Sequence, residues 1–225
     1  MYLVSIISYT FCIFKYQLFV MCYHTKLTAD KKSIEQEFDA VFYEPELYVP
    51  REAINGFSFS KNPIIMDEDK GHIAMANWGL IPFWAKDDSI RKMTLNSRIE
   101  TAASKPAFRN SVKNRCLVIA DAFYEWQWLD AKGKEKQKYI IRPTDQEIFG
   151  FAGLYSEWIN PSNGENMTTY TIATTEANEL MEEIHNNKKR MPIILKKENR
   201  RDWLEGGGLE NFQFPYEVTL TAKAI

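Results

Sequence analysis

Residues 115–129, Arg-Cys-Leu-Val-Ile-Ala-Asp-Ala-Phe-Tyr-Glu-Trp-Gln-Trp-Leu, indicate two consecutive β-strands and decide how the rest of the chain is interpreted. The apolar run Cys116–Ala120 has the length and composition of a strand that is buried on both faces. The run Phe123–Leu129 has a period of two, because Tyr124, Trp126 and Trp128 alternate with Phe123, Glu125 and Gln127. This alternation is typical of a strand that is buried on one face only.

Outward from this pair, further short apolar runs predict a strand-rich chain with a few helices. A capping box at Ser33 and Gln36 predicts the start of a helix with the apolar stripe Ile34, Phe38, Val41 and Phe42. Many short strands without regular strand–helix alternation favour an α+β fold, a single compact domain with a curled or barrel-like mixed β-sheet and peripheral helices. The other predicted strands are Ile73–Ile81, Tyr139–Arg142, Ile148–Leu154 and Thr168–Thr174, and the other predicted helices are Ser97–Ala103, Ala107–Lys113, Glu176–Ile184 and Glu198–Leu204.

The composition of the 225 residues is that of an ordinary globular protein. Hydrophobic residues make up 45% and charged residues 26%, which excludes general disorder, and a net charge of −2 excludes a polycation of the histone kind. The three cysteines contain no Cys-x-x-Cys pair, so they form neither a disulfide framework nor a zinc ribbon. We expect a reducing, cytoplasmic setting, with no cofactor and no metal.

The first twenty residues differ from the remainder, because they hold a single charge, Lys15, and six aromatic side chains. Their length approaches that of a membrane span, but Lys15 and Gln17 interrupt the apolar run. A secretory signal needs an early basic residue and a small-residue cleavage site, and neither is present. We therefore interpret residues 1–20 as sequence upstream of the true start at Met21, or as an extension that is removed, and expect one domain over residues 21–225.

Basic residues concentrate in two segments of this otherwise acidic chain. Residues 85–115 hold eight basic against three acidic residues, and residues 185–201 hold seven against one. Two such segments fit a surface that binds phosphate groups. The alternative is that each segment forms an ordinary solvated helix face.

Five motifs occur in a fixed order along the chain and together resemble the SOS response-associated peptidase (SRAP) family of abasic-site processing proteins. The resemblance runs from Met21 to about Trp203. It implies a compact α+β domain with a positively charged groove for single-stranded DNA that contains abasic sites, and we expect a monomer with no membrane contact. The motifs are Met21-Cys22-Tyr23-His24, Trp78-Gly79-Leu80-Ile81-Pro82-Phe83-Trp84, Asn96-Ser97-Arg98-Ile99-Glu100-Thr101, Phe123-Tyr124-Glu125-Trp126, and Ile184-His185 leading to Arg190-Met191-Pro192.

The family's defining residue is a cysteine that directly follows the initiator methionine, and Cys22 behind Met21 matches it. An α-amine has a pKa of about 8, roughly two units below lysine, so part of it is neutral and nucleophilic at pH 7. Such an amine can form a Schiff base with the aldehyde of an abasic sugar, and the neighbouring thiol can then close a thiazolidine ring. A buried, inert cysteine is the alternative, and we assign that role to Cys116.

Three further residues carry catalytic roles by resemblance. Glu125 matches the family's catalytic glutamate, and its aromatic neighbours suit a raised pKa, although an outward-facing strand glutamate is the alternative. His185 matches the histidine that assists proton transfer, with a structural histidine as the alternative. Asn96 matches the asparagine that orients the amine or a sugar hydroxyl.

Five residues are candidates for DNA binding. Arg98 and Arg190 match family arginines that hold phosphates, although Asn186–Lys189 separate His185 from Arg190 where the family usually has one residue. Thr174 is a candidate hydroxyl near the lesion, with a helix N-cap as its alternative. Trp78 and Trp84 are candidates for stacking on bases, with core packing as the alternative.

Three functions remain open on these residues. The first is a sensor that cross-links to abasic sites in single-stranded DNA through Cys22, with reversal or AP-lyase chemistry through Glu125 and His185. The second is a cysteine peptidase with Cys22 as thiolate and His185 as base, which could remove its own leader. The third is a single-stranded DNA-binding module without chemistry. A zinc site from Cys22, His24, His185 and Cys116 ranks last, because Cys-x-His is poor ligand spacing.

Overall fold

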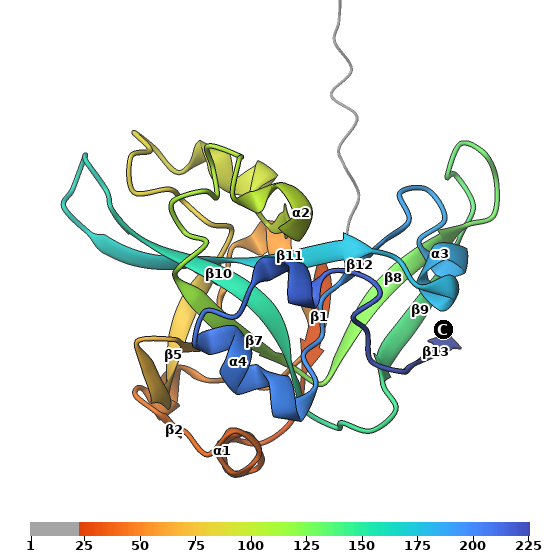
Figure 1. Ribbon diagram of the computed structural model, residues 1–225, viewed down its shortest axis with the longest axis horizontal. Coiled ribbons are helices and arrows are strands. Elements are labelled where there is room, and N and C mark those ends of the chain that lie inside the picture. The colour runs from red at the N-terminus through yellow and green to blue at the C-terminus, as the bar shows by residue number, and fades with distance from the viewer. Residues whose placement is uncertain (1–22) are drawn as a thin grey trace, which may run out of the picture.

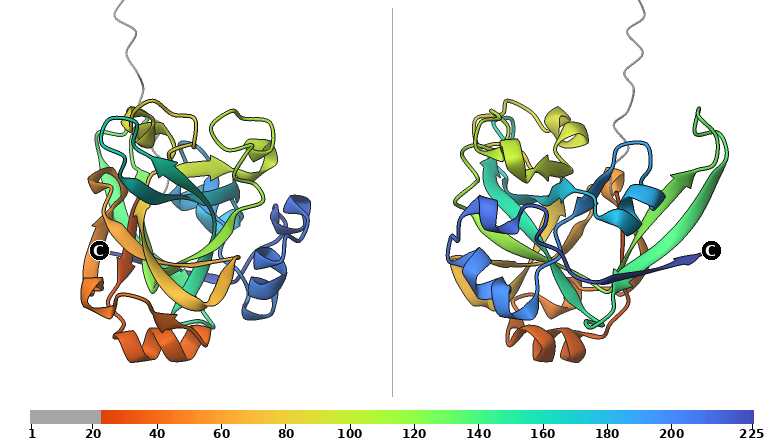
Figure 2. Two further views of the ribbon diagram at one scale, coloured as in Figure 1. Left: turned by 90° about the vertical axis from the view of Figure 1, so that its left-hand side faces the viewer. Right: turned by 45° about the vertical axis from the view of Figure 1, so that its right-hand side comes forward.

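A closed ring of five β-strands forms the centre of the computed structural model, which describes residues 23–225 (Figure 2, left). Cys22 and residues 1–20 lie outside the described residues. Adjacent strands of the ring are antiparallel except where β11 meets β5, a parallel pairing that closes the ring. In order around the ring, the strands are β11 (Asn166–Glu176), β10 (Phe149–Ile159), β7 (Arg115–Ala120), β4 (Lys61–Met66) and β5 (Asp69–Trp78).

The apolar run that predicted a buried strand forms β7, in which every residue is buried. Its neighbour β10 approaches it so closely that a side chain at Gly153 would lie 2.7 Å from Cys116 Sγ. The position is therefore restricted to glycine, since such a contact requires the neighbour to move. The core of the protein fills the ring, with Phe149 and Phe151 packed edge to face at 5.0 Å between ring centroids.

A second sheet of five strands adjoins the ring and holds the run that alternates with period two. That run forms β8 (Ala122–Trp128), and Glu125 of β8 pairs with Tyr139 of β9. The β8–β9 hairpin projects from the body of the protein (Figure 1, right). The strand order is β13 (Leu220–Ala224), β9 (Lys136–Pro143), β8, β1 (His24–Leu27) and β3 (Arg51–Asn55).

Three short strands extend the edges of the ring, and small helices lie outside it. The strands β12 (Arg190–Pro192) and β6 (Asn96–Arg98) pair with β11, and β2 (Val41–Phe42) pairs with β5. The predicted α+β fold with a barrel-like mixed sheet is confirmed. The helices are α1 (Lys31–Phe38), α2 (Ile99–Ala102), α3 (Glu179–Ile184) and α4 (Arg200–Leu204), with 3-10 turns η1 (Pro45–Leu47), η2 (Gly56–Ser58), η3 (Ser89–Met93), η4 (Lys197–Asn199) and η5 (Leu209–Phe212).

Three of the predicted helices were wrong in their extent or type, and one of them, Ser97–Ala103, begins with two residues that belong to β6. Helix α1 is capped by Asp30, whose carboxylate accepts a hydrogen bond from Ser33 N at 3.1 Å, so Ser33 lies inside the helix. The helix ends before Asp39, which has a left-handed φ of 50°, and the expected stripe residues Val41 and Phe42 form β2 instead. The predicted helix Ala107–Lys113 is a series of turns.

Between residues 23 and 225, no helix combines the length and the apolar character that crossing a lipid bilayer requires.

Candidate active site where the two sheets meet

Glu125 lies on the inner face of β8, with Phe123 and Gln127 on the same side. Phe123 is in the core, Glu125 is 2% exposed, and Gln127 donates a hydrogen bond to the Glu183 carbonyl of α3 at 3.2 Å. The outward-facing alternative for Glu125 is therefore wrong. The alternating aromatic residues occupy the other face, where the Lys138 ammonium lies 4.1 Å from the Tyr124 ring centroid.

Burial gives Glu125 the acid–base properties that the sequence suggested. Loss of solvation raises its pKa from 4.5 to about 7, and the electrostatic interaction with His185 limits the rise. The Oε1 atom is buried and has no hydrogen-bond partner among the described residues. At neutral pH this carboxyl is present in both protonation states, which suits a group that both donates and accepts a proton.

His185 follows α3 as its C-terminal cap and is buried. Its Nδ1 lies 2.8 Å from the backbone oxygen and 3.2 Å from the backbone nitrogen of Arg190. The shorter contact favours the tautomer whose Nδ1–H donates to this carbonyl. That tautomer leaves a lone pair on Nε2, as a proton acceptor requires.

Residues 186–189 form a loop between His185 and Arg190, and this loop is bonded to β8. The Asn186 side chain accepts from Trp128 N at 3.1 Å and donates to Trp128 O at 2.9 Å, so it replaces a neighbouring strand at that edge. Lys189 turns the chain back with a left-handed φ of 52°, and its carbonyl accepts from Ala177 N. The longer segment therefore holds His185 on the same side of the site as Glu125.

Asn96 and Thr174 are brought together by the parallel pairing of β6 with β11. Asn96 is buried and pairs in register with Ile172, and Thr174 pairs with Arg98. The Thr174 hydroxyl donates to Ser97 O at 3.2 Å, so it ties the two strands together. Thr174 is not a helix N-cap, because it lies within β11.

The buried Arg190 forms an ion pair with Glu100 of α2, whose side chain is 28% exposed. Its Nη1 and Nη2 donate to the two carboxylate oxygens at 2.9 and 2.8 Å, and Nη2 also donates to Thr174 O at 2.8 Å. Burial alone would raise the pKa of Glu100, but the hydrogen bonds and charge of Arg190 outweigh it and hold the pKa below its usual value. Sequence reasoning missed Glu100, because its motif contains no signal that it pairs with a residue 90 positions away.

Trp78 is fully buried, so its prediction as a stacking platform for bases was wrong. Its Nε1 donates to Leu95 O at 2.8 Å, and its ring stacks on Tyr170 with 6.1 Å between centroids. Because no face of the indole is open, the residue supports the start of β6 rather than a ligand.

The other end of the same motif is exposed. Trp84 is 47% exposed and the adjacent Phe83 is 65% exposed, and Met93 of η3 is 76% exposed. Sequence reasoning missed Phe83 and Met93, although Phe83 stands directly beside Trp84 in the motif. Arg98 is also exposed, at the start of α2, where its guanidinium is available to a phosphate.

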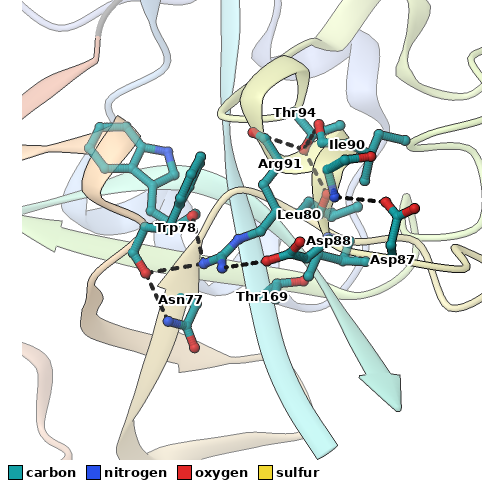
Figure 3. Close-up of polar contacts among 12 residues, drawn as sticks. Asn77, Trp78, Leu80, Asp87, Asp88, Ile90, Arg91, Thr94 and Thr169 are labelled. Atoms are coloured by element: carbon teal, nitrogen blue, oxygen red, sulfur yellow. Dashed lines mark hydrogen bonds and ion pairs between the residues drawn. The ribbon is translucent and has the colours of Figure 1, made fainter. Parts of the chain in front are cut away.

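A small separate core fixes the loop that carries these exposed side chains. Ile81 and Ala85 pack with Trp158 of β10, whose Nε1 donates to Ala85 O at 2.8 Å. Figure 3 shows Arg91 reaching from η3 toward Trp78 and Asp88, with Thr94 bonded to the Leu80 carbonyl. The segment that carries Phe83 and Trp84 is therefore fixed by Trp158 of β10 and by the side chains of Arg91 and Thr94.

The two basic segments present less free charge than their sequences suggest. Arg91, Arg115, Arg190 and Arg200 are all buried, and Arg115 lies 4.4 Å over the Trp203 ring and donates to Gly207 O at 2.7 Å. Burial of Arg115 and Arg200 lowers their pKa values, and both stay bonded to protein acceptors. Neither segment is a simple solvated helix face, and neither is uniformly open to phosphate.

His24 is a further residue beside the site that sequence reasoning considered only as a zinc ligand. Its ring meets Trp126 edge to face, with 4.8 Å between centroids. Burial, and then the charge of Lys138, lower its pKa, which favours a neutral imidazole. Within residues 23–225 no group of His, Cys, Asp and Glu side chains has the arrangement of a metal site. Cys116 is buried in β7 as predicted.

The chain is similar to known proteins in both its sequence and its fold. The chain is 46% identical over 142 residues to the abasic site processing protein YoqW of Bacillus subtilis (strain 168), covering 63% of this chain and 61% of that protein. It is 38% identical over 196 residues to the abasic site processing protein YoaM of the same organism, covering 84% and 81%. A crystal structure of a protein from Bacteroides thetaiotaomicron superposes with a TM-score of 0.82 at 32% identity, covering 91% and 92%.

The family described as SOS response associated peptidase (SRAP) matches residues 21–219, nearly all of the chain and all five of the motifs. The fold, the motifs and these matches agree, and the chain belongs to the SRAP family.

Proposed function

We propose that this protein recognises an abasic site in single-stranded DNA and joins to it covalently through Cys22. The observation that carries the proposal is the buried Glu125, with a pKa of about 7 and His185 nearby. The names of the relatives support the abasic substrate. The AP-lyase reaction described below, and reversal of the cross-link, belong to the same proposal.

The pairing of β1 with β8 supports Cys22 as the reacting residue. His24 pairs with Tyr124, the residue before Glu125. Glu125 is therefore in the middle of β8, one residue beyond the partner of His24, and the two-residue step from His24 to Cys22 can span at most about 7 Å. A protein whose chain begins at Cys22 has its α-amine and its thiol on the same residue.

The proposed reaction consumes an aldehyde and an aminothiol and releases one water. The Cys22 amine adds to C1′ of the ring-opened deoxyribose, a C–N bond forms, and the carbonyl oxygen leaves as water. The thiol sulfur then adds to the carbon of the protonated imine, the nitrogen becomes a neutral amine, and the thiol proton passes to a carboxylate base. The product is a thiazolidine, which blocks further reaction at C1′.

Glu125 and His185 supply the proton transfers in this scheme. Protonated Glu125 donates a proton to the departing oxygen, and the resulting carboxylate accepts one as the ring closes. Before ring closure the imine has a second outcome. If a base removes a proton from C2′, the C3′–O bond breaks and the 3′ phosphate leaves, which is the AP-lyase reaction.

The exposed residues supply binding to the DNA strand on each side of the lesion. Arg98 is exposed, and a guanidinium can hold a phosphate through two parallel hydrogen bonds, which supports its proposed role as a phosphate ligand. The exposed Trp84 and Phe83 offer aromatic faces to bases, and stacking of this kind tolerates any sequence. Binding without sequence preference suits a sensor of lesions.

The test uses protein that begins at Cys22 and an oligonucleotide with one abasic site. We expect an adduct that resists denaturation, which should be lost when the α-amine is acetylated and in Cys22→Ala. Cys22→Ala and Cys22→Ser both retain the α-amine and lack the thiol, so each should still form the imine and shift the outcome toward strand cleavage. Cys116→Ser is the matched control and should retain the adduct. An adduct that survives acetylation refutes the thiazolidine, and cleavage of a leader-bearing precursor without any adduct would favour the peptidase.

A further inference from the structure

One face of the β8–β9 hairpin combines aromatic and basic side chains. The register pairs Trp126 with Lys138 and Trp128 with Lys136, and paired residues of antiparallel strands lie on the same face. The Lys138 ammonium lies 5.7 Å from the Trp126 ring centroid, and the Lys136 ammonium lies 5.5 Å from that of Trp128. This face is opposite to the one that carries Glu125, because side chains alternate along a strand. Aromatic rings interleaved with cations are a combination that binds single-stranded nucleic acid.

The turn of the hairpin fixes the orientation of the Trp128 indole. Gly133 has a left-handed φ of 62°, and a side chain at this position would lie 2.5 Å from Cδ2 and Cε2 of the indole, so the glycine backbone lies directly beside the ring. The Asp130 carboxylate accepts hydrogen bonds from three backbone nitrogens of the turn, which closes it. The ring is therefore held in place before a ligand binds, and this lowers the entropic cost of binding.

Trp128 also lines a cleft between the hairpin and the loop that follows His185. The cleft has a volume of about 490 Å³, and its lining residues are Trp128, Leu129, Asp130, Ala131, Asn186, Asn187 and Lys188. This volume falls in the range of ligand sites, roughly 300–1,000 Å³. Leu129 is exposed, and the Asn187 Oδ1 atom is buried without a hydrogen-bond partner among residues 23–225. The cleft thus combines an aromatic ring, an apolar side chain, a cation and an acceptor for a ligand N–H.

The cleft lies close to the proposed reaction along β8. The His24 ring contacts Trp126, with 4.8 Å between centroids, and His24 is two residues from Cys22. Trp128 is two residues beyond Trp126 on the same face, a distance of about 7 Å in a strand. The loop that forms the other wall begins directly after His185. A nucleotide close to the abasic sugar in the DNA strand can therefore reach the cleft.

We propose that this cleft is a subsite for a nucleotide that flanks the abasic site, with its base against the Trp128 indole and its phosphate beside the Lys136 ammonium. The inference deepens the proposed function and rests on its single-stranded DNA substrate. Stacking on an aromatic ring tolerates any base, and a contact to phosphate carries no sequence information. The loop Asn186–Lys189, which has four residues where the family usually has one, supplies the second wall.

The test measures equilibrium binding to single-stranded oligonucleotides in which a tetrahydrofuran analogue replaces the abasic sugar. The analogue has no aldehyde, so no adduct forms and the measurement is independent of the reaction. A second analogue, moved through successive positions on either side of the first, removes one base and leaves its phosphate. We expect one position close to the lesion at which this removal weakens binding roughly 5- to 150-fold, the range for the loss of one stacked base.

A double-mutant cycle assigns that position to Trp128. Trp128→Ala should weaken binding to the oligonucleotide with all its flanking bases by a similar factor, and it should no longer respond to removal of the base at that position. Trp128→Phe retains an aromatic ring and should keep most of the affinity and the response. Equal urea midpoints establish that the variants are folded. Losses that add at every position would overturn the inference.

The salt dependence of binding tests the phosphate contact separately. Lys136→Ala should reduce the slope of log K against log salt by about 0.7, the value for one phosphate on a single strand, and should keep the response to base removal. Lys32 is exposed on α1, a helix far from the hairpin in Figure 1, and Lys32→Ala is the matched control, which should leave the slope unchanged. A slope that Lys136→Ala does not change would refute the placement of the phosphate.

The natural abasic site separates this inference from the proposed function. If the unmodified protein shows the expected response to base removal but forms no adduct with a natural abasic site, the covalent function fails and the subsite stands. If the adduct forms and no position depends on Trp128, the subsite fails and the covalent function stands.

Discussion

Replacing Glu125 by glutamine retains the size and shape of a buried side chain and removes its ability to ionise. In the native protein, burial raises the pKa of this carboxyl from 4.5 to about 7. The folded state therefore favours the protonated acid, while the unfolded chain releases the proton near pH 4.5. Between these two values the unfolded state binds fewer protons, so the free energy of unfolding falls as the pH rises.

The size of the effect follows from the shift. One pKa unit corresponds to 1.36 kcal/mol, so the ionisation of Glu125 destabilises the fold by about 3 kcal/mol above pH 7. Below pH 4.5 the carboxyl is protonated in both states and this cost is absent. The Glu125→Gln variant never ionises, so it should be more stable than the unmodified protein by about 3 kcal/mol at pH 8.

Urea unfolding at pH 4.5 and pH 8 of the unmodified protein and the Glu125→Gln variant measures this difference. We expect the two proteins to have similar free energies of unfolding at pH 4.5 and the variant to be the more stable at pH 8, with equal m-values at both. The variant should also form the adduct far more slowly. Glu157 on β10 is exposed, and Glu157→Gln is the matched control, which should show no comparable gap. A Glu125→Gln variant that is less stable at pH 8, or a gap that does not change with pH, would refute the argument from burial.

Four other outcomes follow from the same structure. Trp84→Ala should weaken binding to single-stranded DNA by about 1–3 kcal/mol in fluorescence anisotropy, with an unchanged urea midpoint because the side chain is exposed. Trp158→Ala should lower the free energy of unfolding by about 3–5 kcal/mol, because it removes the largest side chain from the small core that Trp158 forms with Ile81 and Ala85. Asn186→Ala should cost about 1–2 kcal/mol and accelerate hydrogen exchange at the Trp128 amide, the group whose partner it removes. If protonated Glu125 acts as the acid, the rate of adduct formation should fall above about pH 7, and this limb of the pH–rate profile should be absent in Glu125→Gln; a limb that persists in the variant belongs to another group.

The local pattern of residues 115–129 was sufficient to predict β7, β8 and the class of fold. A period of two and a run of apolar residues are properties of the strand itself, so they can be recognised without knowing its neighbours. The same pattern could not show which side of β8 faces inward. In this protein the polar Glu125 and Gln127 lie on the inner face, where Gln127 contacts α3, while the aromatic side chains lie on the other face beside the Lys136 and Lys138 ammonium groups.

Motifs identified the family but did not separate supporting residues from contacting ones. Trp78 and Trp84 belong to one motif, yet the first is in the core and the second is exposed. Arg98 and Arg190 both resembled phosphate ligands, and only the fold shows that Arg190 is bonded to Glu100.

The chain by itself determined strand β5 and strands β7 to β11, its family and the residue types available for chemistry, because these depend on near neighbours in the sequence. The tertiary structure decided which charged groups are unpaired, which aromatic side chains are exposed and that the Glu125 carboxyl is shielded from solvent. The physical reason is that solvation and charge pairing depend on atoms brought together from distant segments, and it is solvation that moves the pKa of Glu125 toward neutrality.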